Sequence, residues 1–71
     1  MSATVDRTAL RKAIREFIQA NDPATYAGVV AIVAGTNDVD PKAVENELDA
    51  LESRGFVYLV PTDDGKEVKL V

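Results

Sequence analysis

The chain has 71 residues and a net charge of −4, and it contains neither cysteine nor histidine. A chain of this length forms one small domain, and the missing thiols and imidazoles exclude disulfides, thiolate metal sites and the commonest general base. No serine has a visible base partner, so we expect neither an enzyme nor a bound metal or cofactor.

The first five residues are expected to form a short, loosely ordered lead-in, followed by a single domain over residues 6–71. A first helix is predicted from about Arg7 to Ala20, with Asp6 as its N-cap. Proline at position 23 ends this helix because it disfavours helical backbone at the residue before it. The helix carries apolar residues at helical spacing, namely Leu10, Ile14, Phe17 and Ile18.

A second helix is predicted to begin after Thr25 as N-cap and to end at Gly35. Its β-branched run, residues 29–33, is also compatible with a buried strand, but the caps and interleaved alanines favour a helix. The apolar stretch Tyr26–Ala34 is far shorter than the roughly 20 residues that span a bilayer, and no signal peptide precedes it. We therefore expect a cytoplasmic protein without membrane contact.

Residues 36–39 are predicted to form a turn, and a third helix starts after Asp40 as N-cap with Pro41 in its first position. Gly55 is placed to adopt a left-handed cap, and Arg54 suits the negative end of the helix dipole. Phe56 is expected to pack back on the last turn. The buried stripe of this helix comprises Ala43, Val44, Leu48 and Leu51.

The remaining residues predict a β-hairpin. A strand is expected over Phe56–Val60, and a returning strand over Glu67–Val71, in which apolar and charged residues alternate. Between them, Pro61–Lys66 reads as a polar turn with an Asp-Gly signal.

This order of elements resembles the winged helix-turn-helix superfamily of bacterial and archaeal transcription regulators. The resemblance is carried by Thr25, by the turn centred on Gly35 and by the segment Glu52–Val57 leading into the hairpin, together with the apolar residues Val30, Val33, Val44, Leu48 and Leu51. It implies a small α+β fold over about residues 6–71, with three helices followed by a β-hairpin wing. Residues 55–58 and 65–68 are also similar, more weakly, to winged domains at the carboxyl ends of archaeal replication proteins.

The resemblance implies that the third helix lies in the major groove of DNA, with the hairpin tip beside it. Asn46 would read adenine, and Lys42 would meet a phosphate or guanine. The implied DNA contacts are Lys42, Asn46, Ser53, Thr62, Gly65 and Lys66.

Acidic residues on the third helix oppose this function, because phosphate neutralisation supplies much of the affinity for DNA. We interpret the series as a solvated helix face rather than a metal site. The alternative function is a winged helix that binds another protein and does not bind DNA. The acidic residues are Glu45, Glu47, Asp49 and Glu52.

A basic stripe runs along the first helix and comprises Arg7, Arg11, Lys12 and Arg15. It is either a patch for phosphate or an acidic partner, with a homodimer through this helix as a further alternative, or a solvated surface. The acidic composition, with few lysines and many small aliphatic residues, is also typical of halophile proteins.

Overall fold

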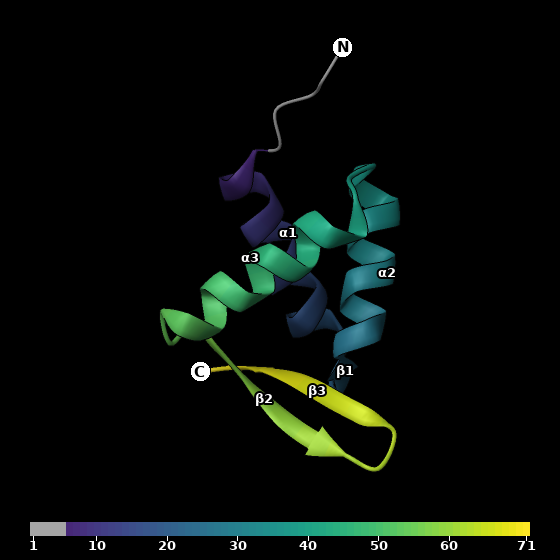
Figure 1. Ribbon diagram of the computed structural model, residues 1–71, viewed down its shortest axis with the longest axis vertical. Coiled ribbons are helices and arrows are strands. Elements are labelled where there is room, and N and C mark those ends of the chain that lie inside the picture. Colours follow the sequence, from purple (N-terminus) through teal and green to yellow (C-terminus); the bar gives the residue numbers. More distant parts are fainter. Residues whose placement is uncertain (1–5) are drawn as a thin grey trace.

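The computed structural model describes residues 6–71, so the expected lead-in over residues 1–5 lies outside the described residues. The protein has an α+β fold in which three helices lie on one side of a small antiparallel sheet (Figure 1). The elements in chain order are α1 (Arg7–Ala20), β1 (Ala24–Thr25), α2 (Tyr26–Asn37), α3 (Pro41–Ser53), β2 (Val57–Thr62) and β3 (Gly65–Leu70).

All three helices begin where their caps predict. The Asp6 carboxylate accepts hydrogen bonds from the backbone N–H groups of Thr8 and Ala9, at 3.0 and 3.2 Å. The Thr25 hydroxyl accepts one from Gly28 at 3.0 Å, and the Asp40 carboxylate accepts one from Lys42 at 2.8 Å. Each side chain satisfies a donor that has no partner within the helix.

The end of α2 differs from the prediction, because the helix continues through Gly35 and stops at Asn37. Asp38 has a φ of 54° and takes the left-handed position at the end of the helix. Gly35 is exposed and fits within a helix, so it does not act as a stop signal. The predicted turn over residues 36–39 was therefore wrong in its first half.

The end of α3 confirms the predicted glycine stop. Gly55 has a φ of 80°, and its N–H donates to the carbonyl of Glu52 at 3.0 Å. The N–H of Phe56 donates to the carbonyl of Leu51 at 2.9 Å, which completes a Schellman motif. The Phe56 side chain was wrongly expected to pack on the helix, since it remains 52% exposed.

The hairpin is longer and tighter than predicted. β2 starts one residue later than expected and extends to Thr62, while β3 covers Gly65–Leu70, so the turn consists of Asp63 and Asp64 alone. The expected polar turn over residues 61–66 was therefore too long. Thr62 pairs with Gly65 at the turn and Val57 pairs with Leu70 at the far end.

The sheet also contains a strand that the sequence analysis missed. β1 pairs antiparallel with β3, with Ala24 opposite Val68, so the strand order is β1-β3-β2. This contact ties the connection between α1 and α2 to the hairpin. The fully buried core joins all three helices to the sheet and includes Ile14, Val29, Val44, Leu48, Leu51, Val57 and Val68. No helix within residues 6–71 is long and apolar enough to cross a membrane.

Candidate functional site

Glu47 on α3 is the one buried charged side chain among residues 6–71, with 3% of its surface exposed. Its carboxylate accepts hydrogen bonds from the Nε atoms of Arg7 at 3.1 Å and Arg11 at 3.3 Å, both on α1. The interpretation of the acidic series as a solvated face was therefore wrong for Glu47. The helix turns by about 100° per residue, so Glu47 lies beside the apolar stripe and faces α1.

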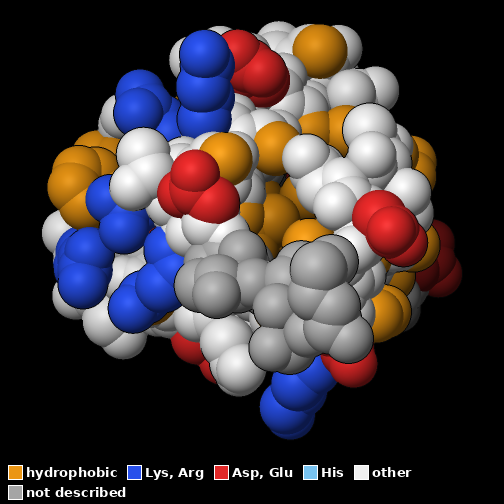
Figure 2. All heavy atoms as spheres, turned by 90° about the horizontal axis from the view of Figure 1, so that it is seen from above, with side chains coloured by type: hydrophobic (Ala, Val, Ile, Leu, Met, Phe, Trp, Pro, Cys, Tyr) orange, Lys and Arg blue, Asp and Glu red, His pale blue; other side chains and the backbone are white. Residues whose placement is uncertain are grey.

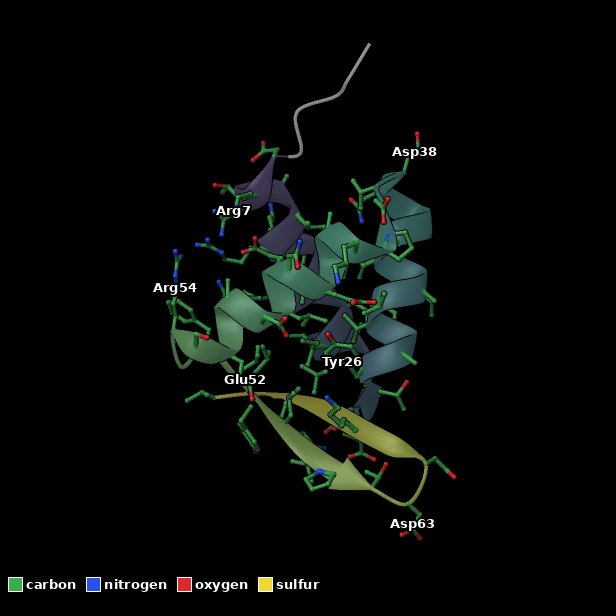
Figure 3. The ribbon with its side chains drawn as sticks, in the orientation of Figure 1. Arg7, Tyr26, Asp38, Glu52, Arg54 and Asp63 are labelled. Carbon is green, nitrogen blue, oxygen red and sulfur yellow. The ribbon has the colours of Figure 1, made fainter. Side chains whose placement is uncertain are left out.

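These contacts define a basic flank of α3. Arg7 remains 62% exposed and Arg11 31% exposed while they bind Glu47, and Arg54 is exposed at the C-cap of α3. Figure 3 shows Arg7 and Arg54 on the same side of α3. In Figure 2, Lys and Arg side chains gather over that side of the molecule. We call Arg7, Arg11 and Arg54 the basic flank.

The opposite side of α3 carries the remaining acidic residues. Glu45, Asp49 and Glu52 all act electrostatically on Tyr26 at the start of α2, and in Figure 3 Tyr26 and Glu52 lie between α3 and the hairpin. Burial raises the pKa of the Tyr26 hydroxyl, and the three carboxylates raise it further by disfavouring the tyrosinate. We call Glu45, Asp49 and Glu52 the acidic flank.

Between the two flanks lies the outward ridge of α3. Lys42, Asn46 and Ser53, which were predicted as DNA contacts, are all exposed there. Asn46 also borders a shallow hollow whose other lining residues include Arg7 and Glu47. The ridge therefore adjoins both flanks, since Asp49 of the acidic flank lies one helical turn from both Asn46 and Ser53.

The hairpin residues that were predicted to contact DNA are separated from the basic flank. Thr62 and Gly65 are exposed at the closed end of the hairpin. Lys66 places its Nζ atom 5.0 Å from the centre of the Tyr26 ring, a cation–π contact. Lys66 therefore lies beside the acidic flank and offsets part of its charge.

The predicted basic stripe on α1 divides into two parts. Arg7 and Arg11 bind Glu47, whereas Lys12 and Arg15 are exposed and line a shallow hollow with Glu16 and Gln19. The exposed pair is available to an anionic surface. The bound pair has part of its charge compensated by Glu47.

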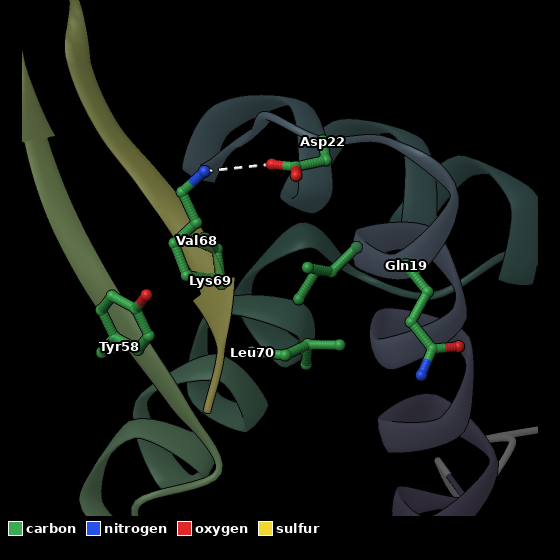
Figure 4. A pocket seen from close by; sticks show the side chains of 7 residues that line it. Gln19, Asp22, Tyr58, Val68, Lys69 and Leu70 are labelled. Atoms are coloured by element: carbon green, nitrogen blue, oxygen red, sulfur yellow. Dashed lines mark hydrogen bonds and ion pairs between the residues drawn. The ribbon is translucent and has the colours of Figure 1, made fainter.

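A pocket of about 250 Å³ lies between the end of α1 and the open end of the hairpin, away from its turn (Figure 4). Lys69 donates a hydrogen bond from Nζ to the Asp22 carboxylate at 3.0 Å across its mouth, and this bond raises the pKa of the lysine. The pair joins β3 to the α1–β1 connection. Tyr58 and Leu70 line the same pocket, which holds no set of groups arranged for proton transfer or nucleophilic attack.

Sequence reasoning missed the two residues that organise this surface. Glu47 lies beside the apolar stripe of α3 and not within it. It is buried because α1 packs against this edge of α3. Tyr26 begins the apolar stretch of the second helix, but its contact with Lys66 and the influence of the acidic flank on it arise from tertiary structure. Within residues 6–71 no group of three or more acidic side chains is placed to hold a metal ion.

The chain matches no protein-family model, no curated protein and no solved structure. The arrangement of charge around α3 is therefore the main guide to function.

Proposed function

We propose that the protein is a winged-helix module that binds DNA through the outward ridge of α3. The observation that carries this proposal is the position of that ridge. Lys42, Asn46 and Ser53 are exposed on the helix that follows the turn after α2, and the basic flank adjoins them. An amide and an ammonium group on one exposed helix face are suited to base and phosphate contacts.

The distribution of charge favours one orientation of the DNA. Phosphates close to Glu45, Asp49 and Glu52 would be repelled, and the single cation of Lys66 does not balance three carboxylates. Phosphates over Arg7 and Arg54 would be attracted. We therefore infer that the duplex leans toward α1, so that arginines of the basic flank replace the hairpin as the principal phosphate contacts.

Two lysines provide a matched test of this orientation. Lys42→Ala removes a positive charge from the outward ridge of α3, and Lys66→Ala removes one from β3 beside the acidic flank. Fluorescence anisotropy with a labelled random duplex, at several salt concentrations, should show that Lys42→Ala weakens binding and lowers the salt slope by about one unit. Lys66→Ala should bind as the unmodified protein does. Equal losses for both variants would contradict the orientation, and no binding at low salt would contradict DNA binding itself.

A second candidate function has its own supporting observation. The three carboxylates of the acidic flank all raise the pKa of Tyr26, which indicates a negative potential between α3 and the hairpin. A winged helix that docks a basic protein segment there would use this potential and would not need DNA. Replacing Asp49 with Asn should lower the affinity for such a basic segment, whereas it should raise the affinity for DNA.

A further inference from the structure

β2 is an edge strand whose outer side has no neighbour within residues 6–71. The strand order is β1-β3-β2, and Figure 1 shows no helix beyond the outer side of β2. At the opposite edge, β1 has only two residues. Unpaired backbone groups along β2 are therefore the longest open hydrogen-bonding edge of the sheet.

The register shows which backbone groups face outward. The N–H of Val71 donates to the carbonyl of Phe56 at 3.2 Å, and hydrogen-bonded pairs alternate with non-hydrogen-bonded pairs along an antiparallel ladder. Residues 58, 60 and 62 therefore point their backbone groups toward β3. The residues whose backbone groups point to the free edge are Val57, Leu59 and Pro61, and the proline lacks an N–H.

The side chains of β2 suit association with another apolar strand. The strand Val57–Thr62 contains no charged residue, although the whole chain has a net charge of −4. Phe56 is 52% exposed and Tyr58 is 48% exposed, and both lie on the same side of the strand as Val60. A row of aromatic and β-branched side chains therefore borders the open edge.

We propose that β2 pairs antiparallel with β2 of a second copy of this chain, with Tyr58 opposite Tyr58 of the second copy. In this register Val57 lies opposite Leu59 of the second copy, so both outward N–H groups of each strand find carbonyl partners. Pro61 falls beyond the paired segment, where its missing N–H costs nothing. Phe56 lies opposite Val60 of the second copy, which is a favourable cross-strand pair.

The absence of charge on β2 allows a second copy of this acidic chain to approach here. Two copies with a net charge of −4 repel each other over most of their surfaces, and an uncharged strand is a place where they can approach closely. Antiparallel pairing of identical strands also produces a closed two-fold dimer rather than a growing fibre. This dimer does not depend on the proposed binding of DNA.

Sedimentation equilibrium on the full chain tests the proposal without DNA. The unmodified protein should show a reversible monomer–dimer equilibrium at concentrations up to about 1 mM, the weak end of specific association. Tyr58→Glu should weaken dimerisation by about tenfold or more, because it places like charges opposite each other. Ile32→Glu is the matched control, since Ile32 is 50% exposed on α2, and it should leave dimerisation unchanged.

A monomer at every concentration, or equal effects of Tyr58→Glu and Ile32→Glu, would overturn the proposal. Circular dichroism melting curves should show that both variants fold. Because the chain contains no cysteine, single cysteine variants give a second readout. Tyr58→Cys should form a disulfide-linked dimer under mild oxidation and Ile32→Cys should not. Cross-linking of Ile32→Cys as efficient as that of Tyr58→Cys would contradict the β2 interface.

Discussion

The carboxylate of Glu47 on α3 accepts a hydrogen bond from the Arg11 guanidinium on α1 at 3.3 Å, with only 3% of the glutamate side chain exposed. Arg7 contacts the other carboxylate oxygen from one helical turn earlier. One acidic residue therefore fixes the two helices side by side and holds both arginines along the flank of α3. The same contacts therefore hold α1 against α3 and determine where the positive charge of the two arginines lies.

Neutralising Glu47 should destabilise the fold. Glu47→Gln retains the shape of the side chain but loses the charge that both guanidinium groups share, so we expect unfolding to become easier by about 1–3 kcal/mol. Urea denaturation measures this change. Glu52→Gln is the control, because Glu52 is exposed, and it should alter stability by no more than about 0.5 kcal/mol. A loss of unfolding free energy in Glu47→Gln no larger than that in Glu52→Gln would contradict a stabilising role of the arginine contacts.

Two exposed glycines should respond to alanine in opposite directions. A Cβ atom at either Gly35 or Gly55 would meet no other atom within 4 Å, so only the backbone distinguishes them. Gly55→Ala forces a side chain into the left-handed region at φ 80° and should cost about 1–2 kcal/mol. Gly35→Ala lies within α2 and should stabilise the protein by about 0.5–1 kcal/mol. Thermal melting curves should show a lower melting temperature for Gly55→Ala and a higher one for Gly35→Ala.

The ionisation of Tyr26 reports on the acidic flank. In a Tyr58→Phe background, Asp49→Asn should lower the pKa of Tyr26 toward its ordinary value of 10.0, as measured by the ultraviolet absorbance of tyrosinate. Glu16→Gln on α1 should leave it unchanged. If both variants leave the pKa unchanged, the acidic flank does not act on the ring.

The raised pKa of Tyr26 also predicts a dependence of stability on pH. The folded chain holds the phenolic proton more tightly than the unfolded chain does. The resulting stabilisation is therefore complete below the unfolded pKa of 10.0 and is lost as the pH rises through the folded pKa. Denaturation curves across this range should show the unfolding free energy of the Tyr58→Phe variant falling more steeply than that of a Tyr26→Phe/Tyr58→Phe variant.

The parts of the fold that depend on local signals could be predicted from the sequence. Asp6, Thr25 and Asp40 mark the helix starts, and Gly55 marks the end of α3, because each acts on backbone groups within a few residues. β1 could not be predicted, since its two residues become a strand only by pairing with β3, more than 40 residues away.

The candidate site was predicted only in part, for the same reason. The exposure of Lys42, Asn46 and Ser53 follows from the position of the apolar stripe on α3. The burial of Glu47 and the position of Lys66 over Tyr26 depend on how separate elements pack together. Counting charges along α3 therefore missed that two arginines of α1 pack beside it and form a basic flank.

A titration of isotope-labelled protein with a random DNA duplex, followed by amide NMR shifts at low and high salt, tests the proposed function most directly. We expect shifts at Lys42, Asn46, Ser53 and Arg54 at low salt, with much smaller changes at Glu45, Asp49 and Lys66. High salt should abolish them, because phosphate contacts release counterions. Amide resonances that stay unmoved at low salt, or shifts centred on the acidic flank, would contradict DNA binding through the outward ridge of α3.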